Sequence, residues 1–133
     1  MLSNYSPPVR APAVYVTQRD HEQLSHRADA LGHTLVGQSL QSALERAIMT
    51  PDKSARIFVR LGSVVAYEDL ATGAVRRLKL CLPEEASLDD RRLSVLTPVG
   101  AALIGASAGQ VFEYAVADNR VRRLQVLEVD DDL

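Results

Sequence analysis

The sequence predicts an α+β protein, in which a short antiparallel helical hairpin precedes an antiparallel sheet carrying one short helix. Three observations support this prediction. Apolar residues recur at helical spacing between residues 18 and 48, the spacing changes to about two from Leu61 onward, and a run of small residues follows Thr97-Pro98. At 133 residues, the chain has the length of one domain, or of one domain with a small appendage.

The first predicted element is a helix that begins after an N-terminal arm. Residues 1–13 are rich in proline and are predicted to form this flexible arm. A very short strand is expected at 14–16, and Thr17 is placed to cap a helix over about 18–30. Asp20 lies in the first turn, where its charge suits the positive end of the helix, and Gly32 is expected to end the element.

A second helix is predicted from an apolar stripe that ends near Pro51, a residue that disfavours helix in the position before it. The stripe consists of Val36, Leu40, Ala43, Leu44, Ala47 and Ile48. Two helices joined by a short turn run nearly antiparallel, so residues 14–50 are predicted to form a hairpin. Each helix is only about 20 Å long at about 1.5 Å per residue, so the hairpin is a stub. Residues 51–60 are predicted to be the linker to the second unit.

The second unit is predicted to be a five-stranded sheet. Thr97 is expected to cap its one short helix, Pro98 suits the first helical position, and Gly105 is expected to follow the last one. The tail 130–133 is acidic and is interpreted as a solvated end. The expected strands are 64–70, 74–82, 93–96, 110–117 and 120–129, with the helix at 99–104 and a turn at 118–119.

Composition limits the kinds of partner that the chain can have. Hydrophobic residues make up 47% and aromatic residues 5%, so the core must be aliphatic. A net charge of −2 argues against strong direct binding to nucleic acid, which requires a basic face. Cys81 is the one cysteine and lies in an apolar run, so we expect a buried thiol in a reducing compartment. The chain shows no signal peptide or membrane span, and we expect a cytoplasmic protein.

Three segments carry a resemblance to a known family. They are 93–105 (LSVLTPVGAALIG), 109–114 (GQVFEY) and 62–73 (GSVVAYEDLATG). In order and spacing they resemble the C-terminal domain of the Gre transcript-cleavage factors, over about residues 61 to 129. Within that family, the first segment is most similar to the branch that is named for regulation of nucleoside diphosphate kinase.

The resemblance implies both a fold and a partner. It implies an FKBP-like sheet domain over 61–129 that docks on RNA polymerase near the mouth of the secondary channel and competes there with Gre factors. The rigid start of the short helix is the expected contact surface, because residues at a sheet-to-helix junction are held in place by the scaffold. The candidate partner-binding residues are Ser94, Thr97, Pro98, Val99 and Ala101.

Two departures from the family pattern affect this expectation. Gln110 stands where the Gre pattern usually has aspartate. The predicted hairpin tip, with Asp29 and His33 as its candidate residues, has one carboxylate where Gre factors present an acidic cluster that helps to hold magnesium. A hard cation needs several oxygen ligands, so we expect no metal site, no cofactor and no stimulation of transcript cleavage. A projecting hairpin would support entry into the channel, whereas one folded flat on the sheet would weaken it.

Two alternative functions are compatible with the sequence. An FKBP-like domain could be a prolyl isomerase, but such sites are apolar pockets lined with several aromatics, and the domain offers only Tyr67, Phe112 and Tyr114. No nucleotide-binding or nucleophile motif is present, so we expect neither an enzyme nor a small-molecule substrate. The third possibility is an interaction module that acts on nucleotide-pool regulation. Basic clusters at 76–79 and 120–123 are interpreted either as protection of strand edges or as contact surfaces.

Overall fold

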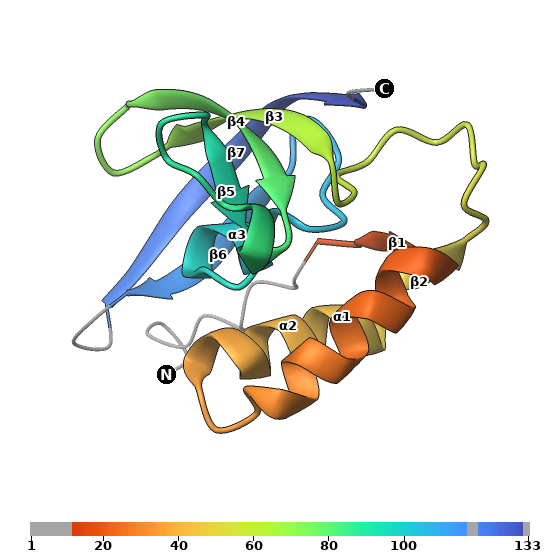
Figure 1. Cartoon of the computed structure of the whole chain (residues 1–133). Helices are drawn as coiled ribbons and strands as arrows, with labels where there is room; N and C mark the ends of the chain where they lie inside the picture. Colours follow the sequence, from red (N-terminus) through yellow and green to blue (C-terminus); the bar gives the residue numbers. More distant parts are fainter. Residues whose placement is uncertain (1–11, 117–119, 132–133) are drawn as a thin grey trace, which may run out of the picture.

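The computed structural model describes residues 12–116 and 120–131, so most of the predicted arm, the predicted turn 118–119 and the last two residues of the acidic tail lie outside the described residues. In the described part the fold is α+β, as predicted (Figure 1). The elements are β1 (Tyr15–Thr17), α1 (Gln18–Ala30), α2 (Leu35–Arg46), β2 (Ile48–Thr50), β3 (Ser63–Asp69), β4 (Val75–Cys81), the 3₁₀ turn η2 (Pro83–Glu85), β5 (Arg92–Ser94), α3 (Pro98–Leu103), β6 (Val111–Val116) and β7 (Arg120–Asp131).

The two long helices begin where side chains cap them. The Thr17 hydroxyl accepts a hydrogen bond from the Asp20 N–H at 3.1 Å, which confirms the predicted cap of α1. The Thr34 hydroxyl accepts one from the Gly37 N–H at 3.0 Å and caps α2. The helices run in opposite directions and bury Leu24, Ala28, Leu40, Ala43 and Leu44, so the predicted hairpin is confirmed.

Helix α2 ends earlier than its apolar stripe predicts. Ala47 has an extended backbone and Ile48 begins β2, so the expectation that both continue the helix is wrong. The cause is tertiary: β2 pairs in parallel with β1, with Tyr15 opposite Ile48, and the Ile48 N–H donates to the Val14 carbonyl at 2.9 Å. A strand partner thirty-three positions away in sequence therefore decides the conformation of this segment.

The main sheet has the strand order β5-β4-β3-β7-β6. Three of its four pairings are antiparallel, as predicted, but β5 runs parallel to β4, so the sheet is mixed. A parallel neighbour needs a crossover connection of roughly a dozen residues, and the segment 82–91 with its 3₁₀ turn supplies one here. The predicted strand and helix boundaries hold to within about two residues, which is the ordinary uncertainty of such boundaries.

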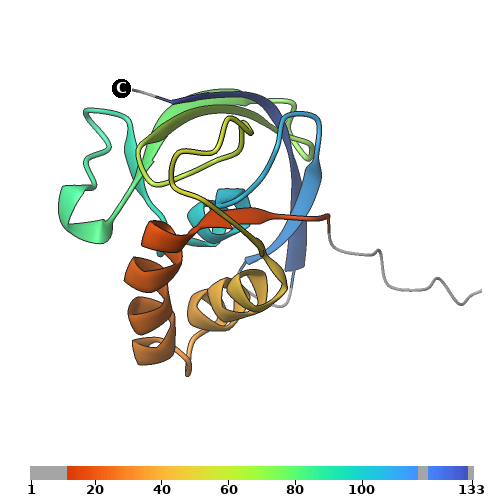
Figure 2. The same ribbon diagram turned by 90° about the vertical axis from the view of Figure 1, so that its right-hand side faces the viewer.

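The helical hairpin contacts α3 and β1 and shares a buried core with the curled sheet. Figures 1 and 2 show α1 and α2 on one side of the molecule, below the sheet, with α2 next to α3 and with the turn between the two helices farthest from the sheet. Leu24 and Leu40 of the hairpin belong to the same buried cluster as Val65, Leu80 and Leu124 of the sheet. The two predicted units therefore share one hydrophobic core.

Part of the predicted linker also belongs to this core. Phe58 and Val59 are each 1% exposed. The Val59 N–H donates to the Ala106 carbonyl at 2.8 Å, and its carbonyl accepts from the Gly105 N–H at 2.9 Å. The second half of the segment 51–60 is thus fixed against the loop that follows α3.

Candidate partner-binding site at the sheet-to-helix junction

The junction between β5 and α3 is held by side-chain hydroxyls. The Ser94 hydroxyl accepts a hydrogen bond from the Leu96 N–H at 3.0 Å. The Thr97 hydroxyl donates to the Ser94 carbonyl at 2.8 Å and accepts from the Gly100 N–H at 3.0 Å, which confirms Thr97 as the helix cap. Pro98 occupies the first turn as predicted, where a missing N–H costs nothing. The junction is therefore a rigid turn.

The five candidate residues differ in how much surface they offer. Pro98 is exposed, and Thr97 and Val99 are half-buried. Ser94 and Ala101 are 9% and 5% exposed, so their contribution is to the turn and to the packing of α3. A partner that approaches this junction meets Pro98 first.

An open groove runs beside Pro98, between α2 on one wall and α3 with β6 on the other. Exposed Leu35 stands at the start of α2, and the half-buried Tyr114 lies on the opposite wall. The remaining lining includes several small or polar residues, among them Gln38, Ser39, Ser42, Ala43 and Ala102. A shallow groove of this kind suits a protein segment better than an enclosed small molecule.

The predicted hairpin tip carries Asp29 and His33. The Asp29 carboxylate accepts a hydrogen bond from Gln41 Nε2 at 3.2 Å, and His33 is exposed. Within residues 12–116 and 120–131, no three histidine, cysteine, aspartate or glutamate side chains gather in a way that could hold a metal ion. No helix in that part of the chain is long and apolar enough to cross a membrane.

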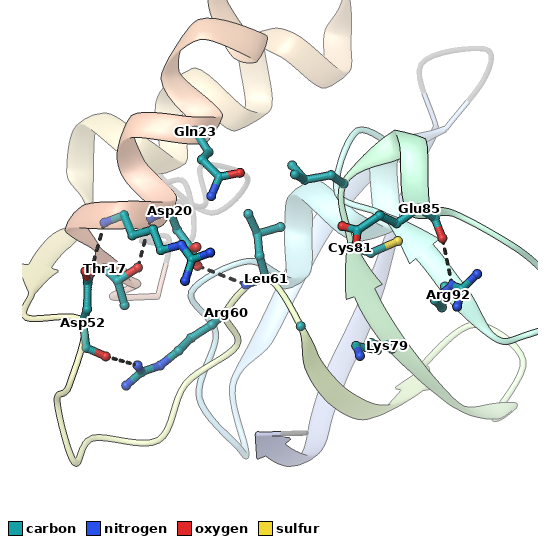
Figure 3. Close-up of a pocket in the computed structure, with 13 residues that line it drawn as sticks. Thr17, Asp20, Gln23, Asp52, Arg60, Leu61, Lys79, Cys81, Glu85 and Arg92 are labelled. Atoms are coloured by element: carbon teal, nitrogen blue, oxygen red, sulfur yellow. Dashed lines mark hydrogen bonds between the residues drawn. The ribbon is translucent and has the colours of Figure 1, made fainter. Parts of the chain in front are cut away.

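A polar cleft lies where the hairpin meets the sheet (Figure 3). Asp20 of α1 is 6% exposed, and its carboxylate accepts a hydrogen bond from the Leu61 N–H at 3.0 Å. The Asp52 carboxylate accepts from the Arg19 N–H at 3.1 Å, and Arg60 donates to the Asp52 carbonyl at 2.8 Å. These contacts join the start of α1 to the segment that leads into β3.

The buried position of Asp20 changes its acidity. Burial raises the pKa of the Asp20 carboxyl above its ordinary value of 3.8, and the Leu61 hydrogen bond and the nearby Arg19 offset this effect only in part. From the sequence, Asp20 is expected only to support the start of the helix. Its bond to a residue forty-one positions away could not be inferred, because local spacing carries no signal of it.

We expect Asp20→Ala to lower the free energy of unfolding by about 1–3 kcal/mol, because the Leu61 N–H loses its acceptor. Asp20→Asn retains an acceptor oxygen and serves as the matched control. Because the folded-state pKa is raised, the stability contributed by Asp20 is present below its unfolded pKa and is lost as the pH rises through the folded value. Urea unfolding from about pH 4 to about pH 8 should show this loss in wild type and not in Asp20→Asn. The same pH dependence of the unfolding free energy in both proteins would refute the raised pKa of Asp20.

Local sequence spacing does not indicate two further long-range contacts. Arg27 of α1 makes a two-pronged ion pair with Glu84, at 3.0 and 2.8 Å. Gln110, the departure from the family pattern, accepts from the Ser107 N–H at 2.9 Å and donates to the Ala13 carbonyl at 3.0 Å. Gln110 therefore ties the segment before β1 to the loop before β6, a contact that requires its amide N–H.

Cys81 lies at the edge of the polar cleft and is 4% exposed, which confirms the expected buried thiol. Its Sγ donates to the Leu93 carbonyl at 3.4 Å. Burial, and to a smaller extent the Glu85 carboxylate, raise the pKa of this thiol. Cys81 is thus kept in its unreactive protonated form.

The architecture matches that of a known class of transcription factor. The solved structure of a prokaryotic transcription elongation factor GreA/GreB from Nitrosomonas europaea has a TM-score of 0.69 and 24% identity, and the match covers 90% of this chain and 98% of that one. This likeness shows that the fold is the one found in GreA/GreB-type proteins. The family model "Transcription elongation factor, GreA/GreB, C-term" matches residues 54–131. The chain belongs to this family.

Two curated relatives show how far the similarity extends. The "Regulator of nucleoside diphosphate kinase" of Escherichia coli (strain K12) is 28% identical over 122 residues, which cover 90% of this chain and 90% of that protein. The "Transcription elongation factor GreA" of Syntrophobacter fumaroxidans is 38% identical over 68 residues, which cover 51% of this chain but only 43% of that protein. The chain therefore spans less than half of the GreA relative. Both relatives are named as a regulator or an elongation factor, and the resemblance found in the sequence is confirmed.

Proposed function

We propose that this chain is a transcription regulator that binds RNA polymerase near the mouth of the secondary channel. The observation that carries the proposal is the exposed Pro98 at a rigid junction, beside an open groove. The surrounding segment 93–105 is also the part of the sequence that most resembles the Gre factors. Thr97 and Val99 complete the proposed contact surface, which would be used in the cytoplasm, where the polymerase works.

The hairpin supports docking without cleavage. Its tip carries Asp29, whose carboxylate is already hydrogen-bonded to Gln41, whereas a hard cation needs several oxygen ligands. The turn between α1 and α2 is the part of the hairpin farthest from the sheet, but helices of 13 and 12 residues give this tip only a short reach toward the channel. We therefore propose that the chain competes with Gre factors for the docking site and does not stimulate transcript cleavage.

We expect Pro98→Glu to weaken binding to core RNA polymerase by about 30-fold or more, because it places a charge at the centre of the proposed contact. Binding is measured with labelled protein, and competition is measured by displacement of GreA. Ile57→Glu is the matched control, since Ile57 is 65% exposed and does not line the groove beside Pro98. Circular dichroism checks that both variants are folded. A folded wild-type protein that neither binds polymerase nor displaces GreA would refute the proposal.

The alternatives receive less support from the geometry. Phe112 and Tyr114 line the groove, but Tyr67 is not part of that lining, so the three aromatics of the domain do not form one pocket. This arrangement does not favour a prolyl isomerase. An action on nucleotide-pool regulation is suggested by the name of the E. coli relative. The same binding assay with nucleoside diphosphate kinase in place of polymerase tests it.

A further inference from the structure

A second candidate surface lies along the side of β4 that faces the edge strand β5. Strand β5 pairs with Lys79, Leu80 and Cys81, the last three residues of β4. The first part of β4, from Val75 to Leu78, has no strand partner on that side within the described residues. This part of β4 is therefore an open strand edge beside the segment that precedes β5.

The strand register identifies which backbone groups face this open edge. The Asp69 N–H donates to the Ala74 carbonyl, so Ala74, and by alternation Arg76 and Leu78, direct their backbone groups toward β3. The backbone N–H and C=O groups then point away from β3, toward the open edge, at Val75, Arg77 and Lys79. The Lys79 N–H confirms this alternation, because it donates to the Arg91 carbonyl at 2.8 Å on the β5 side. Val75 and Arg77 therefore present outward backbone groups that an added strand could pair with.

Apolar side chains are exposed at the same place. Leu88 is 86% exposed and Val75 is 61% exposed. Both line a recess whose floor includes the half-buried Leu78 and Leu93. An exposed apolar pair at an unpaired strand edge favours association, and protein chains commonly block such edges.

The charge around the recess is positive and partly uncompensated. Arg77 is paired with Glu128 and Asp130, and Arg92 is paired with Asp90. Arg76 and Arg91 line the recess, are exposed, and make no ion pair with any residue in the described part of the chain. Arg91 also has a φ of 56°, the one non-glycine residue with positive φ among those described. Such strained positions concentrate where a surface is functional.

We propose that this recess binds an extended acidic segment of a partner protein, which adds as a short strand to the free edge of β4. One apolar side chain of the segment lies between Val75 and Leu88. Flanking carboxylates face Arg76 and Arg91. Backbone hydrogen bonds to Val75 and Arg77 supply affinity, and the arginines select for acidic sequence. This surface is distinct from the junction around Pro98.

The probe is a short blocked peptide of alternating valine and glutamate, and the control peptide has lysine in place of glutamate. We expect the acidic peptide to bind the full chain and to slow amide exchange at Val75 and Arg77. Exchange at Arg76 and Leu78 should not change, because their N–H groups already face β3. Equal binding of the lysine peptide, or protection with the opposite alternation, would overturn the proposal.

Two variants and two matched controls locate the site. Arg91→Gly removes the charge and accepts the positive φ without strain, and Leu88→Asp removes the apolar contact. We expect each to weaken peptide binding by about tenfold. Arg123→Glu and Val121→Asp alter exposed residues of β7 and should leave binding unchanged. If Arg91→Gly and Leu88→Asp changed the oligomeric state but not peptide binding, the recess would be an interface between copies of this chain, and the proposal would fail.

Discussion

Leu40→Ala is expected to lower the free energy of unfolding by about 2–5 kcal/mol. Leu40 lies on α2, is 0% exposed, and belongs to the same cluster as Val65 and Leu80 of the sheet. Removing its side chain leaves a cavity at the contact between hairpin and sheet. Because the two parts share one core, we expect a single cooperative transition at lower temperature or urea concentration, measured by circular dichroism and by tyrosine fluorescence together.

Leu35→Ala is the matched control for this prediction. Leu35 lies on the same helix and is 62% exposed, so the same truncation should change the stability by less than about 0.5 kcal/mol. Two separate transitions in the Leu40→Ala protein, with the sheet unfolding at its wild-type midpoint, would show that the hairpin is an independent unit. That result would support a hairpin that can move relative to the sheet and enter a channel.

Gly105→Ala is expected to be the second strongly destabilising change. Gly105 follows α3 with a φ of +81°, a conformation that costs an alanine about 1–2 kcal/mol. An added Cβ would also lie 2.5 Å from the Tyr15 carbonyl oxygen and 3.0 Å from the Val14 Cβ. Forcing β1 away from this loop adds about 1–3 kcal/mol. Urea denaturation measures the sum, and the Tyr15 N–H, which donates to the Gly105 carbonyl, should exchange faster.

Gly109→Ala separates the two contributions. Gly109 has a φ of +90°, close to that of Gly105, but nothing lies within 4 Å of the position of its Cβ. The variant therefore carries the conformational cost without the clash, and it should be destabilised by only about 1–2 kcal/mol. Equal losses for the two variants would show that the close approach of β1 to this loop contributes nothing.

Gly105 has one property that the sequence indicates, its left-handed conformation, and one that it does not, its contact with β1. A glycine after a short apolar helix indicates a left-handed residue, and the structure confirms it. The sequence does not indicate that β1 packs against this same glycine, because the two segments are about ninety residues apart. The parallel pairing of β1 with β2 is missed for the same reason.

In the candidate site, the backbone conformation could be predicted from the sequence, but the exposure of its residues could not. The motif around Thr97 and Pro98 has a local signature, a cap followed by proline at the first helical turn, and its conformation could be predicted. Which of its residues are exposed could not be predicted, because exposure depends on what packs against α3. Contact with the core buries Ala101 and leaves Pro98 open.

By itself, the sequence determined the fold class, the caps of α1 and α3, most of the strands and the family. Each of these depends on residues a few positions apart, whose spacing acts directly on backbone conformation and hydrogen bonding. Only the tertiary structure decided that the hairpin and the sheet share one core, that Asp20 bonds to Leu61, and that β4 keeps an open edge beside Leu88. These features arise from contacts between distant segments, and their energies depend on burial and register, which no local pattern encodes.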